Sequence, residues 1–449
     1  MFSARGMDMK YAFLNAMLLD GNLDDTGHMP IRKNAAIFVT DDKITNVYIG
    51  NHPDTAGYQV VDLGGKYVLP GLINAHSHFV PAMPVRKSKT GKESKKIDLA
   101  ALKQKLAGSR IADQIISFVL KGVARDTVCS GVTTVRTVGG LYDADAKIRD
   151  RIQSGNVTGP RMLVANTAIS VPGGHMAGLL ATDVTCPADA MRDVREIAGT
   201  KPNLIKLMVT GGVLDATETG EPGALKMAPE IVKAACDEAH ALGYQVAAHT
   251  ESAEGVKVAL QNGVDTIEHG AKPDEEMLNL FKERNAADIC TLSPALPYVF
   301  MDPAETGLGE LGRHNGTIVF NGIVECAKAC MENGIPVGLG TDTGCPFITP
   351  YDMWREIDYF VRFCGVTPSF ALHTATKVNA EILGIGDETG VIEAGKSADF
   401  IVAEGNPLDD FETLRNLSMV CVQGKLIRNP RVKRIKSIDK ALDDVMRKS

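Results

Sequence analysis

Apolar positions follow two different patterns along this chain. Up to residue 69, short apolar runs at 11–19, 35–40, 44–49 and 58–62 are separated by turn-forming Asp-Gly, Asp-Asp and Asn-His-Pro sequences. Such spacing is typical of short strands joined by tight turns. The first part of the chain is therefore predicted to be a small all-β unit.

From residue 70 onward, short apolar runs alternate with longer segments of helical period. Strands are predicted at 71–75, 132–138, 161–166, 204–209, 245–250, 265–269, 287–292 and 336–341, and helices between most of them, such as 111–129, 188–198, 229–242 and 316–333. Eight alternating units favour an α/β fold with a parallel (β/α)8 TIM barrel. An open doubly wound sheet is the alternative, but ligand-type residues follow strands from the first to the last, as in a closed barrel.

Two further strand-like segments, 390–402 and 418–428, follow the barrel pattern. We expect them to rejoin the N-terminal strands in a small β-sandwich formed from both chain ends. The predicted division is a sandwich domain of residues 1–69 and 390–449 and a barrel domain of residues 70–389. A last helix is expected over 438–447, after a basic stretch that we interpret as solvated surface.

Composition narrows the possible partners. The net charge of −7 gives no reason to expect nucleic acid as a partner, and no apolar run approaches the ~18 residues of a membrane-spanning helix. The first residues lack the apolar core of a signal peptide. The nine cysteines are scattered, and Cys326 and Cys330 lack the Cys-x-x-Cys spacing of a zinc ribbon. We therefore expect free thiols in a cytoplasmic protein that does not bind membranes.

The first barrel strand ends in His76 and His78. Alternate residues of a strand point to the same face, so these two imidazoles project together and form half of a metal site. Further ligand-type residues follow other strands: His249, His269 and Asp342. Lys206 lies within the apolar strand 204–209, where a charged lysine is costly unless it is paired or chemically altered.

These five separated motifs, in this order, resemble those of the amidohydrolase superfamily, in particular its prolidase-like and imidazolonepropionase-related branch. The resemblance implies that Lys206 is carboxylated by carbon dioxide to a carbamate that bridges two divalent metal ions. It implies that His76, His78 and Asp342 hold one ion, and His249 and His269 the other. This ligand set suits zinc, with manganese, iron or cobalt as alternatives.

The implied activity is hydrolysis of an amide bond in a dipeptide, such as an Xaa-Pro-like one, or in an N-acyl amino acid. Two cations would share and activate a water as a bridging hydroxide, and Asp342 would act as general base and then acid. The resemblance also implies a homo-oligomer. A cyclic-amide hydrolase of the imidazolonepropionase type or a mononuclear deaminase remains the alternative, because Glu251 follows His249 by two residues, as in such relatives. A non-catalytic scaffold is disfavoured, because all six ligand positions are present.

Other positions bear on the substrate. His175 follows two glycines after the third strand and, by the resemblance, faces the substrate, where it would polarise the carbonyl or bind a carboxylate. Arg136, at the end of the second strand, is a weaker candidate for a substrate carboxylate. Met227 aligns with a substrate-contacting tyrosine of relatives, which argues against proline specificity. The basic segment 86–96 is interpreted as a solvated lid segment.

Overall fold

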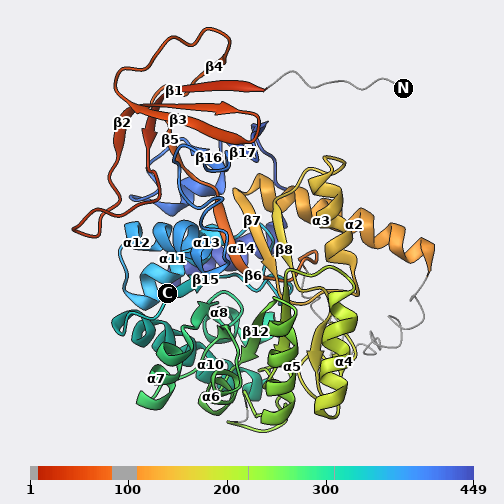
Figure 1. The fold of residues 1–449 in the computed structure, drawn as a ribbon. Helices are drawn as coiled ribbons and strands as arrows, with labels where there is room; N and C mark the ends of the chain where they lie inside the picture. The colour runs from red at the N-terminus through yellow and green to blue at the C-terminus, as the bar shows by residue number, and fades with distance from the viewer. Residues whose placement is uncertain (1–8, 83–108, 221, 308, 449) are drawn as a thin grey trace.

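The computed structural model describes residues 9–82, 109–220, 222–307 and 309–448. The basic segment 86–96 lies outside these ranges. The described chain is an α/β protein with three sheets, in which a mainly antiparallel sheet lies at one end of a larger body of parallel strands and helices (Figure 1). Among the described residues, no helix is long and apolar enough to span a membrane.

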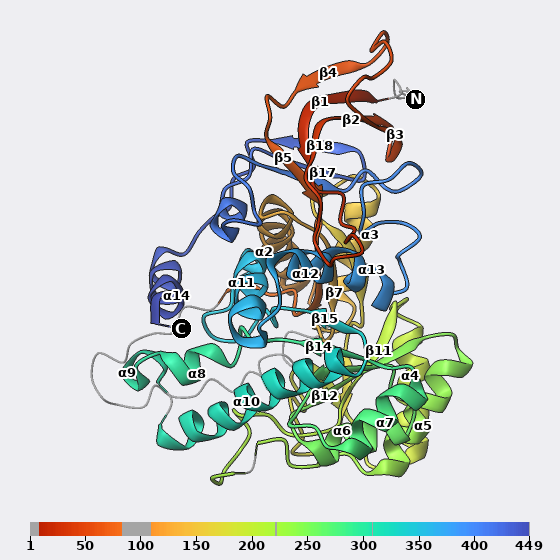
Figure 2. The same cartoon turned by 90° about the vertical axis from the view of Figure 1, so that its left-hand side faces the viewer.

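Both ends of the chain contribute to the first sheet (Figure 2). The junction is the antiparallel pair in which Phe400 lies opposite Pro70. Phe13 and Phe400 then meet edge to face, with 4.9 Å between ring centroids, inside a core shared by the two ends. The strands are β1 (Lys10–Leu18), β2 (Arg32–Thr40), β3 (Lys43–Ile49), β4 (Gln59–Asp62), β5 (Tyr67–Pro70), β16 (Phe400–Ala403), β17 (Met419–Val422) and β18 (Lys425–Arg428).

The strand predicted over residues 390–402 is wrong for most of its length. Only β16 is extended, and the preceding residues form turns in which Gly390 and Gly395 have φ values of 102° and 91°. Glycine enters this left-handed region without steric penalty, so the two glycines break the strand that the neighbouring apolar residues suggest. The prediction gave more weight to the strand-forming apolar residues of this segment than to its turn-forming glycines.

The eight strands predicted for the barrel are all present, in two parallel sheets. One sheet has the order β6-β7-β8, and the other has the order β10-β9-β11-β12-β13-β14-β15. The strands are β6 (Leu72–Ser77), β7 (Val132–Thr137), β8 (Arg161–Val164), β9 (Ala168–Ser170), β10 (Ala181–Asp183), β11 (Leu204–Met208), β12 (Gln245–Thr250), β13 (Thr266–His269), β14 (Ala287–Cys290) and β15 (Val337–Leu339).

Side chains join the first and last of these strands. The Asn379 amide donates to the carbonyls of Ile73 on β6 and Leu339 on β15, at 2.7 and 2.9 Å. At the carboxyl ends of the strands, the backbone N–H groups of Thr341 and Asp342 both donate to His76 O, at 3.0 and 2.9 Å. β6 and β15 are therefore neighbours, although an asparagine takes the place of a regular ladder between them.

Helices flank the parallel strands on their outer sides (Figures 1 and 2). The C-terminal helix α14 packs beside α11, where Arg355 bonds Asp443 at 2.5 Å. The helical segments are α2 (Arg110–Cys129), α3 (Ala144–Gln153), α4 (Pro187–Ala198), α5 (Pro229–Ala241), α6 (Ala253–Gln261), α7 (Glu275–Arg284), α8 (Leu296–Phe300), α9 (Pro303–Thr306), α10 (Glu310–Glu332), α11 (Met353–Cys364), α12 (Pro368–His373), η1 (Thr374–Val378), α13 (Asn379–Ile382), η2 (Phe411–Arg415) and α14 (Lys436–Lys448). The four predicted inter-strand helices and the C-terminal helix are confirmed, and α10 begins six residues earlier than expected.

Candidate active site

The two histidines of the first barrel strand converge on one carboxylate. The Nε2 atoms of His76 and His78 lie 3.3 and 3.2 Å from the same oxygen of Asp342. The other nitrogen of each ring is fixed from behind: His76 Nδ1 contacts Glu268 at 2.5 Å, and His78 Nδ1 contacts Gly139 O at 2.8 Å. Both Nε2 atoms are thereby directed into the site, which is the usual arrangement of metal-binding imidazoles.

Asp342 is held in an uncommon backbone conformation. Its φ is 51°, in the left-handed region that non-glycine residues rarely adopt, and such residues cluster at functional sites. Burial alone would raise the pKa of this carboxyl, but the imidazoles of His76 and His78 hold the pKa well below its ordinary value. Gly340 makes the approach possible, because a Cβ there would lie 2.3 Å from His76 Cβ. Asp342 is therefore an ionised, buried acceptor.

His249 and His269 end the neighbouring strands β12 and β13 and complete a ring of imidazoles. The ring centroids of His249 and His269 are 4.7 Å apart, and those of His269 and His76 are 4.8 Å apart. Burial, followed by the neighbouring imidazoles, lowers the pKa of both residues well below the ordinary value for histidine. Both rings are thus neutral at neutral pH, the form that binds metal ions.

Lys206 lies in the middle of β11 with its side chain fully inside the protein. Its exposed fraction is 1%, and Nζ has no hydrogen-bond partner among the described residues. Desolvation, assisted by Arg136, lowers its pKa to about 8, although Glu268 and Asp342 act in the opposite direction. A buried, unpaired amine is unusual because lysines in this position normally find a counter-ion or reach solvent.

The donor set fits divalent metal ions. Donor atoms of His76, His269 and Asp342 lie within 4.8 Å of one another in the absence of an ion. Neutral imidazoles with an ionised carboxylate are the ligands that zinc and similar cations take. Lys206 also fits this donor set, because its Nζ has no hydrogen-bond partner among the described residues and a carbamate formed on it would gain partners. The structure thus brings together every ligand-type residue singled out from the sequence.

His175 lies beside this cluster, as the sequence predicted, and it has a partner that sequence reasoning missed. Its ring stacks on that of His249 with 4.2 Å between centroids and 10° between planes. Asp215 contacts His175 Nδ1 at 2.5 Å and also accepts from Gly212 N at 3.0 Å. The carboxylate lies 40 residues away in sequence, and no local signal connects the two.

A pocket opens above the imidazoles. Its polar lining includes His175, Glu251 and Asp342, and burial raises the pKa of Glu251 to about 8, with help from Asp342 and Asp215. The remaining lining is mostly apolar and comes from three segments of the chain: Val213, Leu214, Pro294, Ala295, Tyr298, Val319 and Ile323. The pocket therefore joins a polar end, at the histidines, to an apolar wall.

Two residues considered as substrate contacts have other roles. Arg136 is buried and bonds Glu268 at 2.7 and 2.9 Å, Thr266 at 3.0 Å and Ala75 O at 2.5 Å. It forms a buried ion pair with the carboxylate that orients His76, so the suggestion that it binds a substrate carboxylate is wrong. Met227 is fully buried in the main core, and the tyrosine lining the pocket is Tyr298 from α8.

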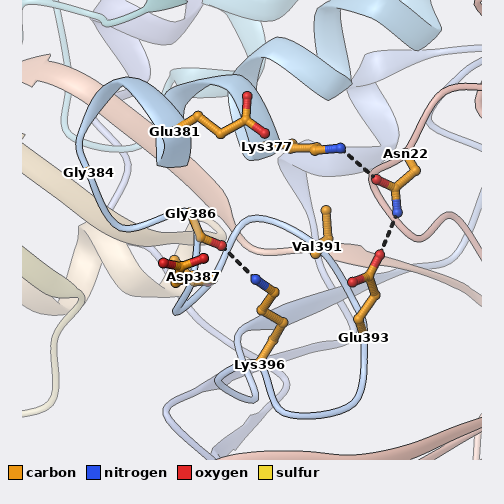
Figure 3. Close-up of a pocket in the computed structure, with 10 residues that line it drawn as sticks. Asn22, Lys377, Glu381, Gly384, Gly386, Asp387, Val391, Glu393 and Lys396 are labelled. Carbon is orange, nitrogen blue, oxygen red and sulfur yellow. Dashed lines mark hydrogen bonds between the residues drawn. The ribbon is translucent and has the colours of Figure 1, made fainter.

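A different concavity lies near the sheet shared by the chain ends (Figure 3). Three of its charged groups are bonded to their neighbours: Lys377 and Glu393 both contact Asn22, and Lys396 donates to Gly386 O at 2.7 Å. No histidine lines this polar crevice, and we assign no chemistry to it.

The fold and the site are typical of a hydrolase in which ligand-type residues gather at the carboxyl ends of parallel strands. The Amidohydrolase family model matches residues 67–427, so the chain belongs to the amidohydrolase family. Its members similar to this chain include hydrolases of amide and peptide carbon–nitrogen bonds.

Solved structures with the same fold include a candidate prolidase from Bifidobacterium longum, which is 35% identical, with a TM-score of 0.84, covering 98% of this chain and 99% of that one. A Xaa-Pro dipeptidase with bound methionine is 28% identical, with a TM-score of 0.78, covering 93% of this chain and 100% of that one. Ochratoxinase from Aspergillus niger is 26% identical over 331 residues, which are 67% of this chain and 66% of that enzyme. The matched region therefore spans just under two thirds of ochratoxinase.

Proposed function

We propose that this protein hydrolyses an amide bond in a dipeptide or an N-acyl amino acid, using two divalent metal ions, preferably zinc. His76, His78 and Asp342 would hold one ion, and His249 and His269 the other. Lys206, carboxylated by carbon dioxide, would bridge the two. The resemblance to the dipeptidase and to ochratoxinase supports an amide substrate.

The observation that carries the proposal is the unpartnered amine of Lys206. A fully buried Nζ without a hydrogen bond is destabilising as a cation and weakly satisfied as an amine. Carboxylation converts it into an anion with two oxygens. Two nearby cations would then balance the charge, and four imidazoles surround the position at which they would lie.

The roles of the side chains follow from their contacts. When bound, the cations would polarise the carbonyl and lower the pKa of a water molecule. Asp342 has one carboxylate oxygen at the two histidines, and the other accepts from Cys345 Sγ at 3.3 Å. This second oxygen would take up a proton and deliver it to the leaving amine. Arg136 and Glu268 hold the His76 ring in place from behind. His175, oriented by Asp215, would face the carbonyl or a substrate carboxylate.

The pocket suggests which side chains the substrate carries. The apolar wall formed by Leu214, Tyr298 and Ile323 favours an apolar group on one side of the scissile bond. The deletion of one methylene from a substrate group in such a pocket typically changes specificity by about 10–200-fold. A graded series of N-acyl amino acids and dipeptides tests this preference directly.

Glu251 supports a second candidate, a mononuclear deaminase or a cyclic-amide hydrolase. Its carboxyl is buried in the same pocket, 4.0 Å from His249 Nε2. Relatives at 22% and 23% identity include a 5-methylthioadenosine/S-adenosylhomocysteine deaminase from Bacillus cereus and an imidazolonepropionase from Mesorhizobium japonicum. Lys206 favours the binuclear alternative, because a mononuclear site has no use for it.

A library of dipeptides, N-acyl amino acids, adenosine derivatives and imidazolones, screened with zinc-loaded protein, separates the candidates. Turnover of a dipeptide or N-acyl amino acid that is lost in Lys206→Ala and partly restored by short carboxylic acids supports the proposal. Deamination or ring opening by a Lys206→Ala protein with full activity contradicts it.

The closed (β/α)8 barrel, the β-sandwich and the domain limits at residues 69–70 and 389–390 belong to the same proposal. The asparagine bridge between β6 and β15 supports the closed barrel, and the sheet that both chain ends share supports a small domain formed from the two ends. Assembly into a homo-oligomer remains a prediction from the family resemblance, and sedimentation analysis tests it.

A further inference from the structure

A second cluster of potential metal ligands lies between strand β14 and helix α10. It consists of Asp288 on β14 and Cys326 and Cys330 on α10, and all three are fully buried. The two cysteines are four residues apart, so they project from the same face of the helix. One donor atom of each residue lies within 4.8 Å of the others. None of these residues lines the pocket above the imidazoles.

Asp288 is the anomalous member of this cluster. Its side chain is completely buried, and the weak contact with the Cys326 thiol is the interaction that its oxygens make among the described residues, short of a hydrogen bond of normal geometry. Burial raises the pKa of its carboxyl well above the ordinary value, and the groups around it, the thiols of Cys326 and Cys364 and the carboxylate of Glu268, raise it further. Among the described residues, no lysine or arginine forms an ion pair with Asp288. A buried carboxylate that no cation neutralises is costly.

The backbone around Cys326 is suited to a thiolate. The N–H of Ala271 bonds its sulfur, a contact that lowers the pKa of the thiol, although Cys330 and burial raise it. Gly270 makes room for the cluster, because a Cβ there would lie 2.8 Å from both Asp288 Oδ1 and Cys326 Sγ. The φ of Gly270 is +80°, so a side chain is disfavoured on conformational grounds as well.

We propose that Asp288, Cys326 and Cys330 form a structural zinc site, separate from the proposed catalytic centre. Zinc takes thiolate and carboxylate ligands in tetrahedral geometry, with Zn–S near ~2.3 Å and Zn–O near ~2.1 Å. Ligand atoms of such a site are roughly 3.5–3.8 Å apart, so separations of up to 4.8 Å have to shrink by at most about 1.3 Å. Both cysteines would lose their protons on binding, and zinc would offset two of the three negative charges that the two thiolates and the carboxylate then carry.

Other buried cysteines allow the proposed zinc ligands to be tested by comparing substitutions inside and outside the cluster. Cys364 lies close enough to raise the pKa of Asp288, and Cys290 is hydrogen-bonded to Cys364. Cys236 on α5 is equally buried but lies against Gly263, outside the cluster. It is the matched control for replacing a buried thiol by serine.

The experiment measures metal content in the folded protein and does not depend on activity. Protein produced with zinc is counted by elemental analysis and by mass spectrometry under non-denaturing conditions. A variant that lacks catalytic ligands, His76→Ala with His249→Ala, should still carry about one zinc per chain. Adding Cys326→Ser should remove that ion, whereas adding Cys236→Ser should leave it in place.

Cobalt gives an independent readout, because thiolate ligands of Co²⁺ produce a charge-transfer absorption band in the near ultraviolet. Protein produced with cobalt should show this band, and Cys330→Ser should weaken it. If the cysteine variants do not fold, the zinc content and the cobalt absorption band of the His76→Ala/His249→Ala variant still test the proposal. An absent band and no residual ion there would overturn the proposal and leave a protonated Asp288 beside two neutral thiols. If the site is real and the proposed catalytic centre is wrong, the wild type should hold a single ion that requires Cys326.

Discussion

Replacing Lys206 by methionine should abolish activity and, at the same time, stabilise the metal-free protein. The perturbation keeps the length of the side chain and removes its amine. The pKa of a free lysine, 10.5, falls to about 8 at this position. At ~1.4 kcal/mol per pKa unit, the difference corresponds to about 3 kcal/mol, which is the electrostatic penalty of the protonated amine inside the barrel. The side chain is fully buried, so solvent does not reduce this figure appreciably.

The sign of the pH dependence follows from proton binding. Between pH 8 and 10.5 the folded protein binds fewer protons at Lys206 than the unfolded chain does, so the free energy of unfolding contributed by this group rises with pH across that window. Below pH 8 the whole penalty is present. Lys206→Met should therefore increase the free energy of unfolding of the metal-free protein by about 3 kcal/mol at pH 7, and the gain should shrink as the pH approaches 10.5.

The same pKa makes the amine available for carboxylation. At pH 7 about one tenth of an amine with a pKa of 8 is neutral, against about one in 3,000 for a pKa of 10.5, so the reactive form is ~300-fold more abundant. Wild-type protein incubated with zinc and ¹³C-labelled bicarbonate should show a carbamate carbon signal by NMR, and at fixed dissolved carbon dioxide its formation should rise with pH up to about 8. Urea denaturation of metal-free and zinc-loaded protein measures the stability change. Retained activity in Lys206→Met, or a less stable metal-free variant, would refute the reasoning.

Three further outcomes are expected. Asp342→Asn should remain folded and lower kcat by roughly 10²–10⁴-fold, whereas Glu251→Gln should lower kcat only mildly on an amide substrate. Steady-state kinetics measures both effects, and the reverse order of severity would favour the mononuclear alternative. Arg136→Met removes the guanidinium from the buried Glu268 carboxylate, which keeps only Thr266 and His76 as side-chain partners among the described residues, and should lower the free energy of unfolding by about 3–5 kcal/mol. The exposed control Arg192→Met, which loses its pair with Asp189, should lose under ~1 kcal/mol in the same denaturation assay. All nine cysteines are free in the structure, so the melting temperature should be the same with and without reductant, and a large drop on reduction would reveal a disulfide.

Periodicity located most of the strands that position the site, because β-branched runs followed by polar residues carry a clear local signal. The contacts that hold the proposed metal ligands in position leave no such local signal in the sequence. Thr266 and Glu268 share one face of β13 and meet Arg136, so strict alternation would direct His269 away from them. His269 has a φ of 74°, which breaks the alternation and returns its ring to the site. A pattern of residue types contains no information about that single dihedral angle.

Long-range partners were beyond sequence reasoning for a similar reason. Asp215 was not singled out, because 40 residues separate it from His175 and its surroundings resemble an ordinary loop. Asn379 lies in a short helical turn, yet its amide links the first and last barrel strands. Such roles depend on which backbone groups tertiary packing leaves without partners.

Two buried basic residues on the parallel strands differ in chemistry, which explains why one is structural and the other is proposed to be reactive. Arg136 cannot lose its proton, and its donors are matched by Glu268, Thr266 and Ala75 O, so the buried charge is neutralised where it stands. Lys206 has no such partners, and an amine can release its proton to become a nucleophile for carbon dioxide. Replacing lysine by arginine at one position, or arginine by lysine at the other, should therefore impair the protein. Lys206→Arg adds a permanent charge that cannot be carboxylated, and Arg136→Lys leaves part of the Glu268 carboxylate without a donor.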